Sequence, residues 1–129
     1  MQITANLLVD SIEACLPFYV ERLGFTKKVE VQHPVGSESG VLGFVILERE
    51  GAELMMQSRA SIAADVAGLE GEASRSFLYV TVDRLGPVRD ALASWPKVVP
   101  ERTTFYGARE IIVRDPAGNV LALASHEPA

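Results

Sequence analysis

The closing segment of the chain decides its fold: Thr104-Phe-Tyr-Gly-Ala-Arg-Glu-Ile-Ile-Val-Arg-Asp-Pro-Ala-Gly-Asn-Val-Leu-Ala-Leu-Ala-Ser125. Two apolar runs, 108–114 and 120–125, flank the residues Asp115-Pro-Ala-Gly-Asn119. Proline presets φ, glycine supplies a positive φ, and Asp and Asn side chains bond to the nearby backbone. The segment therefore predicts an antiparallel hairpin with a five-residue connection.

A second hairpin is predicted earlier in the chain, where Val41–Glu48 and Ala52–Gln57 flank Arg49-Glu-Gly51. Aligning the sequences of the two hairpins matches Met55 with Ala122. The same alignment matches Asn6-Leu-Leu-Val-Asp10 with Tyr79-Val-Thr-Val-Asp83. Both halves then read strand–helix–strand–strand–strand, which predicts an internal duplication.

The remaining elements follow from periodicity and end signals. In the first half we expect a strand over 3–9, a helix that starts with an Asp10/Glu13 capping box and stops at Gly24 with a kink at Pro17, and a strand over 25–32. In the second half we expect a strand over 77–82, a helix over 87–95 after a cap at Asp83, and a strand over 97–102. Residues 58–75 are expected to be a linker with a short helix around 61–67.

Composition limits the classes of function. The chain has 129 residues, of which 48% are hydrophobic, and no apolar run approaches the roughly 18 residues of a membrane span. No secretory signal is visible at the N-terminus, and the lone Cys15 excludes an internal disulfide. The net charge of −5 without a basic cluster argues against nucleic acid and anionic membranes. We therefore expect a cytoplasmic protein whose partner is a small molecule, a second subunit, or both.

Two short motifs carry a resemblance to a known family. They are Phe18-Tyr19-X3-Leu23-Gly24-Phe25 in the first half and Asp115-Pro116-X-Gly118-Asn119 in the second half of a duplicated chain of this length. This combination resembles the vicinal oxygen chelate superfamily, which includes glyoxalase I, bleomycin resistance proteins, extradiol dioxygenases and fosfomycin resistance enzymes. The resemblance implies a single α+β domain over 1–129. Its two βαβββ modules, 1–57 and 76–126, would form a curved mixed sheet with a central cleft and helices outside.

The resemblance also implies where a metal would bind. Metal-dependent members carry His and Glu ligands on the first and last strands of each module, and the matching positions here are Thr4, Met55, Phe77 and Ala122. None is a usual ligand, and Glu53, two residues from Met55, is a single carboxylate where a divalent ion needs several ligands. The two histidines, His33 and His126, lie at a strand end and in the C-terminal tail. We expect neither a metal nor another cofactor.

The resemblance further implies a lined cleft. Alanines would leave room, aromatic rings would offer stacking faces, and Asn6, Glu53 and Gln57 would orient a polar group, although the same side chains equally suit a filled interior. Arg109 would either bind an anionic group at the rim or be a surface arginine beside Glu110. The expected cleft residues are Thr4, Asn6, Glu53, Met55, Gln57, Phe77, Tyr79, Tyr106, Arg109 and Ala122.

Three functions remain open from the sequence. The first is a metal-independent, homodimeric small-molecule-binding protein of the glyoxalase and bleomycin resistance type that sequesters an apolar or planar ligand. The second is a lyase, isomerase or dioxygenase-like enzyme of the same superfamily, with Glu53 as the weak catalytic candidate, either holding a metal or acting as a base. The third is a structural or regulatory module whose cleft is filled.

Overall fold

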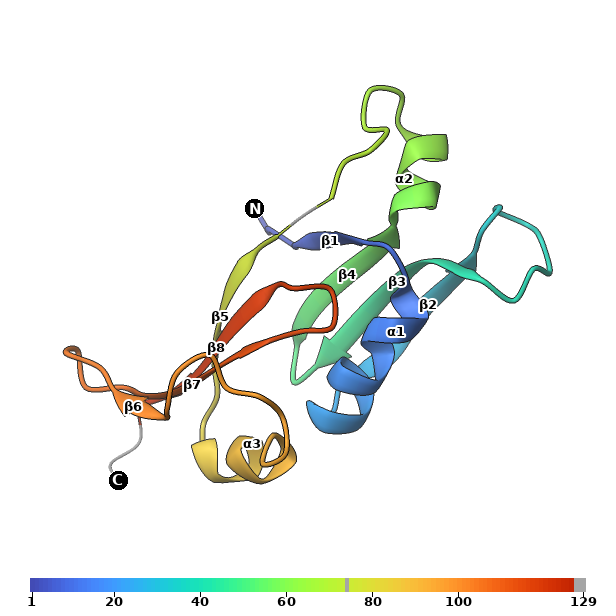
Figure 1. Cartoon of the computed structure of the whole chain (residues 1–129). Coiled ribbons are helices and arrows are strands. Elements are labelled where there is room, and N and C mark those ends of the chain that lie inside the picture. The colour runs from blue at the N-terminus through green and yellow to red at the C-terminus, as the bar shows by residue number, and fades with distance from the viewer. Residues whose placement is uncertain (74, 127–129) are drawn as a thin grey trace. The chain divides into compact units, whose positions relative to one another are not determined.

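The computed structural model describes residues 1–73 and 75–126 and divides into two compact units, Met1–Ser74 and Arg75–Ala129 (Figure 1). The sheet of the first unit has the strand order β1-β4-β3-β2, with β1 parallel to β4 and the other pairs antiparallel. Its elements are β1 (Asn6–Val9), α1 (Ile12–Leu16), η1 (Pro17–Arg22), β2 (Thr26–Gln32), β3 (Leu42–Arg49), β4 (Ala52–Ser58) and α2 (Arg59–Asp65).

The second unit repeats this topology. Its strand order is β5-β8-β7-β6, and β5 is parallel to β8. The pairing of Asn6 with Met55 in the first sheet matches the pairing of Tyr79 with Ala122 in the second, which confirms the alignment of the two halves. The predicted α+β fold with two βαβββ modules is therefore confirmed. The elements are β5 (Phe77–Thr81), α3 (Leu85–Ala91), β6 (Arg102–Thr103), β7 (Arg109–Arg114) and β8 (Val120–Ser125).

Each unit buries the face of its sheet that packs on its helix. Strand residues alternate between faces, so every second side chain points to the helix. Each buried aliphatic or aromatic side chain contributes about 1.5–3 kcal/mol relative to an exposed one. The buried side chains include Leu7, Val9, Ile12, Phe18, Tyr19, Val45, Leu47 and Met56 in the first unit, and Leu85, Val88, Leu92, Ile111, Val113, Leu121 and Leu123 in the second.

The start of the first helix differs from the prediction. The cap is Ser11, whose hydroxyl accepts a hydrogen bond from the Ala14 N–H at 3.2 Å, and the expected Asp10/Glu13 box does not form. The Asp10 carboxylate instead pairs with Arg59 at 3.0 Å, and Glu13 accepts from the Leu42 N–H at 2.6 Å. Both carboxylates thus bind partners distant in sequence and do not form the capping box.

Pro17 changes the helix type, a stronger effect than the predicted kink. Proline lacks an N–H donor, and its ring clashes with the carbonyl four residues earlier, so an α-helix cannot continue unchanged through it. The backbone widens into the π-helix η1, which ends where the Leu23 N–H donates to the Phe18 carbonyl at 3.1 Å. Gly24 follows with a φ of 76°, as expected for the residue that stops a helix.

The second half also corrects two predictions. Helix α3 begins at Leu85, two residues before the predicted start, because Pro87 is tolerated within a first turn. No side chain caps it, and the Asp83 carbonyl accepts from the Ser125 hydroxyl at 2.9 Å. The strand predicted over 97–102 is reduced to one bridge between Lys97 and Val113 and to the short β6. Pro96, directly before this segment, and Pro100, within it, lack the backbone N–H that a strand residue donates.

In the predicted linker, the short helix expected around 61–67 is α2, which the Ser58 hydroxyl caps by accepting from the Ser61 N–H at 3.1 Å. Ser74, also in this linker, lies outside the described residues. Across 1–73 and 75–126, no helix is both long enough and apolar enough to cross a membrane.

The turn between β7 and β8 confirms the predicted turn chemistry. Asp115 Oδ1 accepts from the backbone N–H groups of Ala117 and Asn119 at 2.9 and 2.8 Å, and Gly118 has a φ of 91°. Asn119 Nδ2 donates to Asp115 Oδ2 at 3.0 Å, while Asn119 Oδ1 accepts from the Ser76 N–H at 2.8 Å. The turn therefore also fixes the chain just before β5.

Candidate functional site

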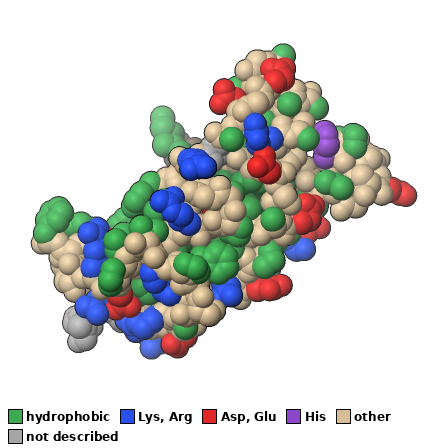
Figure 2. Space-filling model, in the orientation of Figure 1, with side chains coloured by type: hydrophobic (Ala, Val, Ile, Leu, Met, Phe, Trp, Pro, Cys, Tyr) green, Lys and Arg blue, Asp and Glu red, His purple; other side chains and the backbone are tan. Residues whose placement is uncertain are grey.

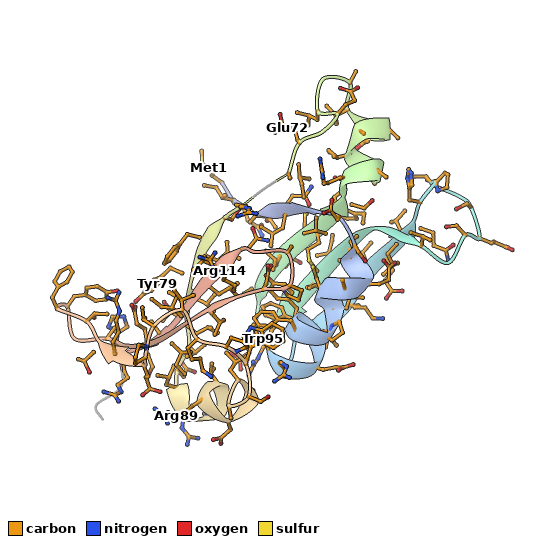
Figure 3. All side chains as sticks on the ribbon, in the orientation of Figure 1. Met1, Glu72, Tyr79, Arg89, Trp95 and Arg114 are labelled. Atoms are coloured by element: carbon orange, nitrogen blue, oxygen red, sulfur yellow. The ribbon has the colours of Figure 1, made fainter. Side chains whose placement is uncertain are left out.

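The second unit has a sheet face opposite α3 that combines aromatic, small and charged residues. Strand pairing sets three rows across this face: Phe77–Val120–Arg114, Tyr79–Ala122–Ile112 and Thr81–Ala124–Glu110–Arg102. We call these residues the face opposite α3. Figure 2 shows hydrophobic and basic side chains side by side over this unit, and Figure 3 labels Tyr79 and Arg114.

The aromatic residues of this face are accessible. Phe77 is 64% exposed and Tyr79 is 47% exposed, whereas Ala122 and Ala124 beside them are buried. An exposed aromatic ring offers a face on which a planar group can stack. The structure thus brings together Phe77, Tyr79 and Ala122 from the predicted set.

A buried carboxylate lies at one end of the face opposite α3. Glu110 is only 2% exposed, and its Oε1 accepts a hydrogen bond from Arg102 Nε at 2.7 Å. Arg102 Nη2 forms an ion pair with the same oxygen at 2.6 Å. The Tyr106 hydroxyl donates to Glu110 Oε2 at 3.3 Å. A hydrogen bond with Tyr106 raises the pKa of the Tyr79 phenol, and burial adds to the shift. We call Tyr79, Arg102, Tyr106 and Glu110 the Glu110 cluster.

Sequence reasoning missed two members of this cluster, Arg102 and Glu110. A signal was present, because Glu110 falls in an apolar run at the same parity as Ile112. A carboxylate at an inward-facing strand position needs a partner. Tyr106, one of the expected cleft residues, does join the cluster, and its ring centroid lies 6.3 Å from that of the His126 imidazole.

Arg109 lies apart from the other predicted cleft residues of this unit. It is adjacent to Glu110 in β7 and so points to the opposite face, the side of α3. There its Nε donates to Glu101 Oε2 at 2.7 Å and its Nη1 to the Thr103 hydroxyl at 3.1 Å. The geometry favours the second interpretation of Arg109, a surface arginine, whose ion-pair partner is Glu101.

Glu101 is held by two arginines, and this predicts an acid-sensitive contribution to stability. Hydrogen bonds from Arg89 at 2.8 and 3.0 Å, opposed by burial and reinforced by Arg109, lower its pKa from 4.5 to about 2. A lowered pKa in the folded state stabilises the fold above the unfolded value and loses that contribution as the pH falls toward 2. Because the site is near solvent, we expect on the order of 1 kcal/mol.

Urea unfolding at several pH values checks this prediction. From pH 4.5 down toward 2, the wild type should lose about 1 kcal/mol more stability than Glu101→Gln. Glu70→Gln, which changes an exposed carboxylate outside this ion-pair network, is the matched control and should follow the wild type. Identical pH profiles for the wild type and Glu101→Gln would contradict the assignment.

In the first unit, the structure brings together Asn6, Met55 and Gln57. Asn6 pairs with Met55 in register, and its Nδ2 donates to Gln57 Oε1 at 3.1 Å. Gln57 Nε2 donates in turn to the Ser61 hydroxyl at 3.0 Å. Thr4 precedes β1 and lies outside the strand.

Glu53 is on β4 at the same parity as Met55 and is engaged in an ion pair. Its carboxylate accepts a hydrogen bond from the Lys28 ammonium, and this bond raises the pKa of Lys28. A carboxylate neutralised by an ammonium is a poorer base and a poorer metal ligand than a free one.

Comparison with known proteins assigns the family. Residues 2–123 match the Glyoxalase/Bleomycin resistance protein/Dioxygenase superfamily. The chain belongs to this superfamily. The comparison with curated proteins gives no match.

Solved structures with this superfamily fold resemble the chain over nearly its whole length. TioX from Micromonospora sp. ML1 has a TM-score of 0.78 at 16% identity, covering 98% of this chain and 99% of that one. A lactoylglutathione lyase from Agrobacterium tumefaciens has a TM-score of 0.73 at 15% identity, covering 97% and 92%. A bleomycin resistance determinant encoded on the transposon Tn5 has a TM-score of 0.66 at 22% identity, covering 99% of each chain. At these identities the likeness concerns the fold alone.

The residues of this superfamily member do not fit the metal site that the resemblance implies. Register places Asn6 opposite Met55 and Tyr79 opposite Ala122, with Thr4 and Phe77 two residues earlier in the chain. Within 1–73 and 75–126, no three His, Cys, Asp or Glu side chains gather where they could hold a metal ion. Amide, thioether, phenol and methyl groups do not make the His- and carboxylate-rich donor set that divalent ions prefer.

Proposed function

We propose that this protein is a metal-independent small-molecule-binding protein that sequesters an apolar or planar ligand on the face opposite α3. The observation that carries the proposal is the pair of exposed rings, Phe77 and Tyr79, beside the small residues Ala122 and Ala124. Removing apolar surface from water stabilises a complex by about 25 cal/mol per Å². Ligand sites generally combine such apolar surface with a few fixed polar groups, a role that the Glu110 cluster suits.

The side chains at the strand positions where the resemblance implies a metal site support binding without a metal. They offer no combination of imidazole and carboxylate. An enzyme built around Glu53 is less well supported, because Lys28 already pairs with that carboxylate. The superfamily likeness does not choose between the classes, since its solved members include both a lyase and a resistance determinant.

Calorimetric titration of the chelator-treated protein tests the proposal. Bleomycin and acridine orange, two ligands with planar aromatic groups, should be tried in turn. We expect at least one to release heat and to bind equally well with and without added Zn²⁺. No heat from either ligand, or binding that requires the metal, would overturn the proposal.

We also propose that the protein is a cytoplasmic homodimer. Two observations are in keeping with this: the chain has a single cysteine, Cys15, which is buried, and the second unit carries a fully exposed Phe105 beside the half-exposed Tyr106. Exposed aromatic side chains are enriched at subunit interfaces. Sedimentation equilibrium should give twice the chain mass of 14.0 kDa, and a monomer at all concentrations would contradict the dimer.

A further inference from the structure

We propose that the ligand of the face opposite α3 carries an anionic group, which the Arg114 guanidinium binds while an aromatic ring of the same ligand stacks on Phe77. This inference rests on the proposed function and adds the chemical class of the ligand, a planar aromatic carboxylate or a similar anion. The rings bind a planar molecule of any charge, and the anionic group adds affinity.

Arg114 lies in the same row of the sheet as Phe77. Val120 pairs with Phe77 on one side and with Arg114 on the other, so the three residues cross β5, β8 and β7 in line. Because neighbouring strands are about 4.8 Å apart, the Cα atoms of Phe77 and Arg114 lie roughly 10 Å apart. Phe77 and Arg114 are exposed, and Val120 between them is partly exposed. A flat ligand that lies over Val120 therefore reaches the ring at one end and the guanidinium at the other.

The backbone of Arg114 is fixed, whereas its guanidinium is available. The Arg114 carbonyl accepts a hydrogen bond from Trp95 Nε1 at 2.8 Å (Figure 3 labels both residues). The carboxylate of the next residue, Asp115, binds N–H groups of the β7–β8 turn. Among residues 1–73 and 75–126, the Arg114 guanidinium has no ion-pair or hydrogen-bond partner. Its planar set of N–H donors matches the two oxygens of a carboxylate.

The other charged residues of the face opposite α3 neutralise each other. They are Glu110 and Arg102, which form an ion pair at 2.6 Å, so the positive charge of Arg114 is not balanced within the three rows. The chain as a whole has a net charge of −5, which repels anions at long range. A preference for an anionic ligand must therefore arise at short range, from Arg114.

Three probes with the same rings separate charge from stacking. At neutral pH 2-naphthoate is an anion, whereas 2-naphthamide, which has nearly the same shape, and 2-naphthol are neutral. In fluorescence titrations, the wild type should bind 2-naphthoate about tenfold more tightly than 2-naphthamide, as expected for a charge-assisted bidentate contact near solvent. Added NaCl should reduce this preference by screening the charges. Arg114→Gln should remove the preference and keep the affinity for the two neutral probes, which also shows that the variant is folded.

Two further variants separate a local contact from a change in net charge. Arg84→Gln removes the same charge from an exposed arginine at the N-terminus of α3, outside the three rows, and should leave the preference unchanged. Arg114→Lys keeps the charge without the planar donors and should retain part of the preference.

The outcomes distinguish this inference from the proposed function. Equal binding of 2-naphthoate and 2-naphthamide by the wild type, or an unchanged preference in Arg114→Gln, would overturn the inference and leave the proposed function standing. A loss of preference in Arg84→Gln as large as that in Arg114→Gln would do the same. Binding of none of the three probes would overturn both.

Discussion

Replacing Asp115 by alanine is expected to lower the free energy of unfolding by about 3 kcal/mol. Asp115 is buried, and its carboxylate accepts from two backbone N–H groups and from the Asn119 amide. Without it, these donors lose their partners in a place that water reaches poorly. Asn119 would also lose its fixed orientation, and with it the bond that holds the Ser76 N–H before β5.

Urea unfolding of Asp115→Ala measures this loss. The matched control is Glu48→Ala near the end of β3, where the Glu48 carboxylate accepts from the N–H of Gly51 in the β3–β4 turn at 2.8 Å, in an exposed contact. Water replaces that bond readily, so we expect a loss of about 0.5–1 kcal/mol. Equal losses in the two variants would contradict the view that the β7–β8 turn organises the second unit.

Replacing Tyr79 by alanine is expected to weaken planar-ligand binding about 30-fold, or by about 2 kcal/mol. Tyr79 lies in the middle row of the face opposite α3, between the rows of Phe77 and Thr81. The variant loses both the ring surface and the phenol oxygen at once. Because the side chain is half-exposed, the stability of the fold should change by less than about 1 kcal/mol.

Titration of Tyr79→Ala with 2-naphthol measures this effect, and Phe105→Ala is its control. Phe105 is an aromatic residue of the same unit that is fully exposed, lies in the loop before β7 and is not a member of the three rows. Its removal should change the affinity less than twofold. If Phe105→Ala weakens binding as much as Tyr79→Ala, the face opposite α3 is not the site.

The elements that local chemistry determines could be predicted from the sequence. The β7–β8 hairpin follows from its turn residues, since the Asp115 carboxylate binds Ala117 and Asn119 within the turn itself. The cap of the first helix could not be predicted from local sequence. Its two candidate carboxylates bind partners elsewhere in the first unit, Asp10 to Arg59 and Glu13 to the Leu42 N–H. Contacts distant in sequence decided between two locally acceptable caps.

The candidate site shows a similar division. The hairpin register, once accepted, pairs Ile112 with Ala122 and Glu110 with Ala124, so Glu110 could have been placed beside the predicted alanines. Arg109, one residue away, belongs to the other face for the same reason. The contact of Tyr106 with Glu110 lies beyond such reasoning, because it depends on the path of the loop between β6 and β7.

A methyl NMR titration of the chelator-treated protein with 2-naphthol tests the central claim most directly. We expect shifts of the methyl signals of Ala122, Ala124 and Ile112, which lie beside Tyr79 and Glu110 on the face opposite α3. The Ala14 methyl signal, from the exposed side of α1 in the first unit, should not move. Binding that leaves all three signals unmoved, or that appears only after a divalent metal is added, would contradict the account.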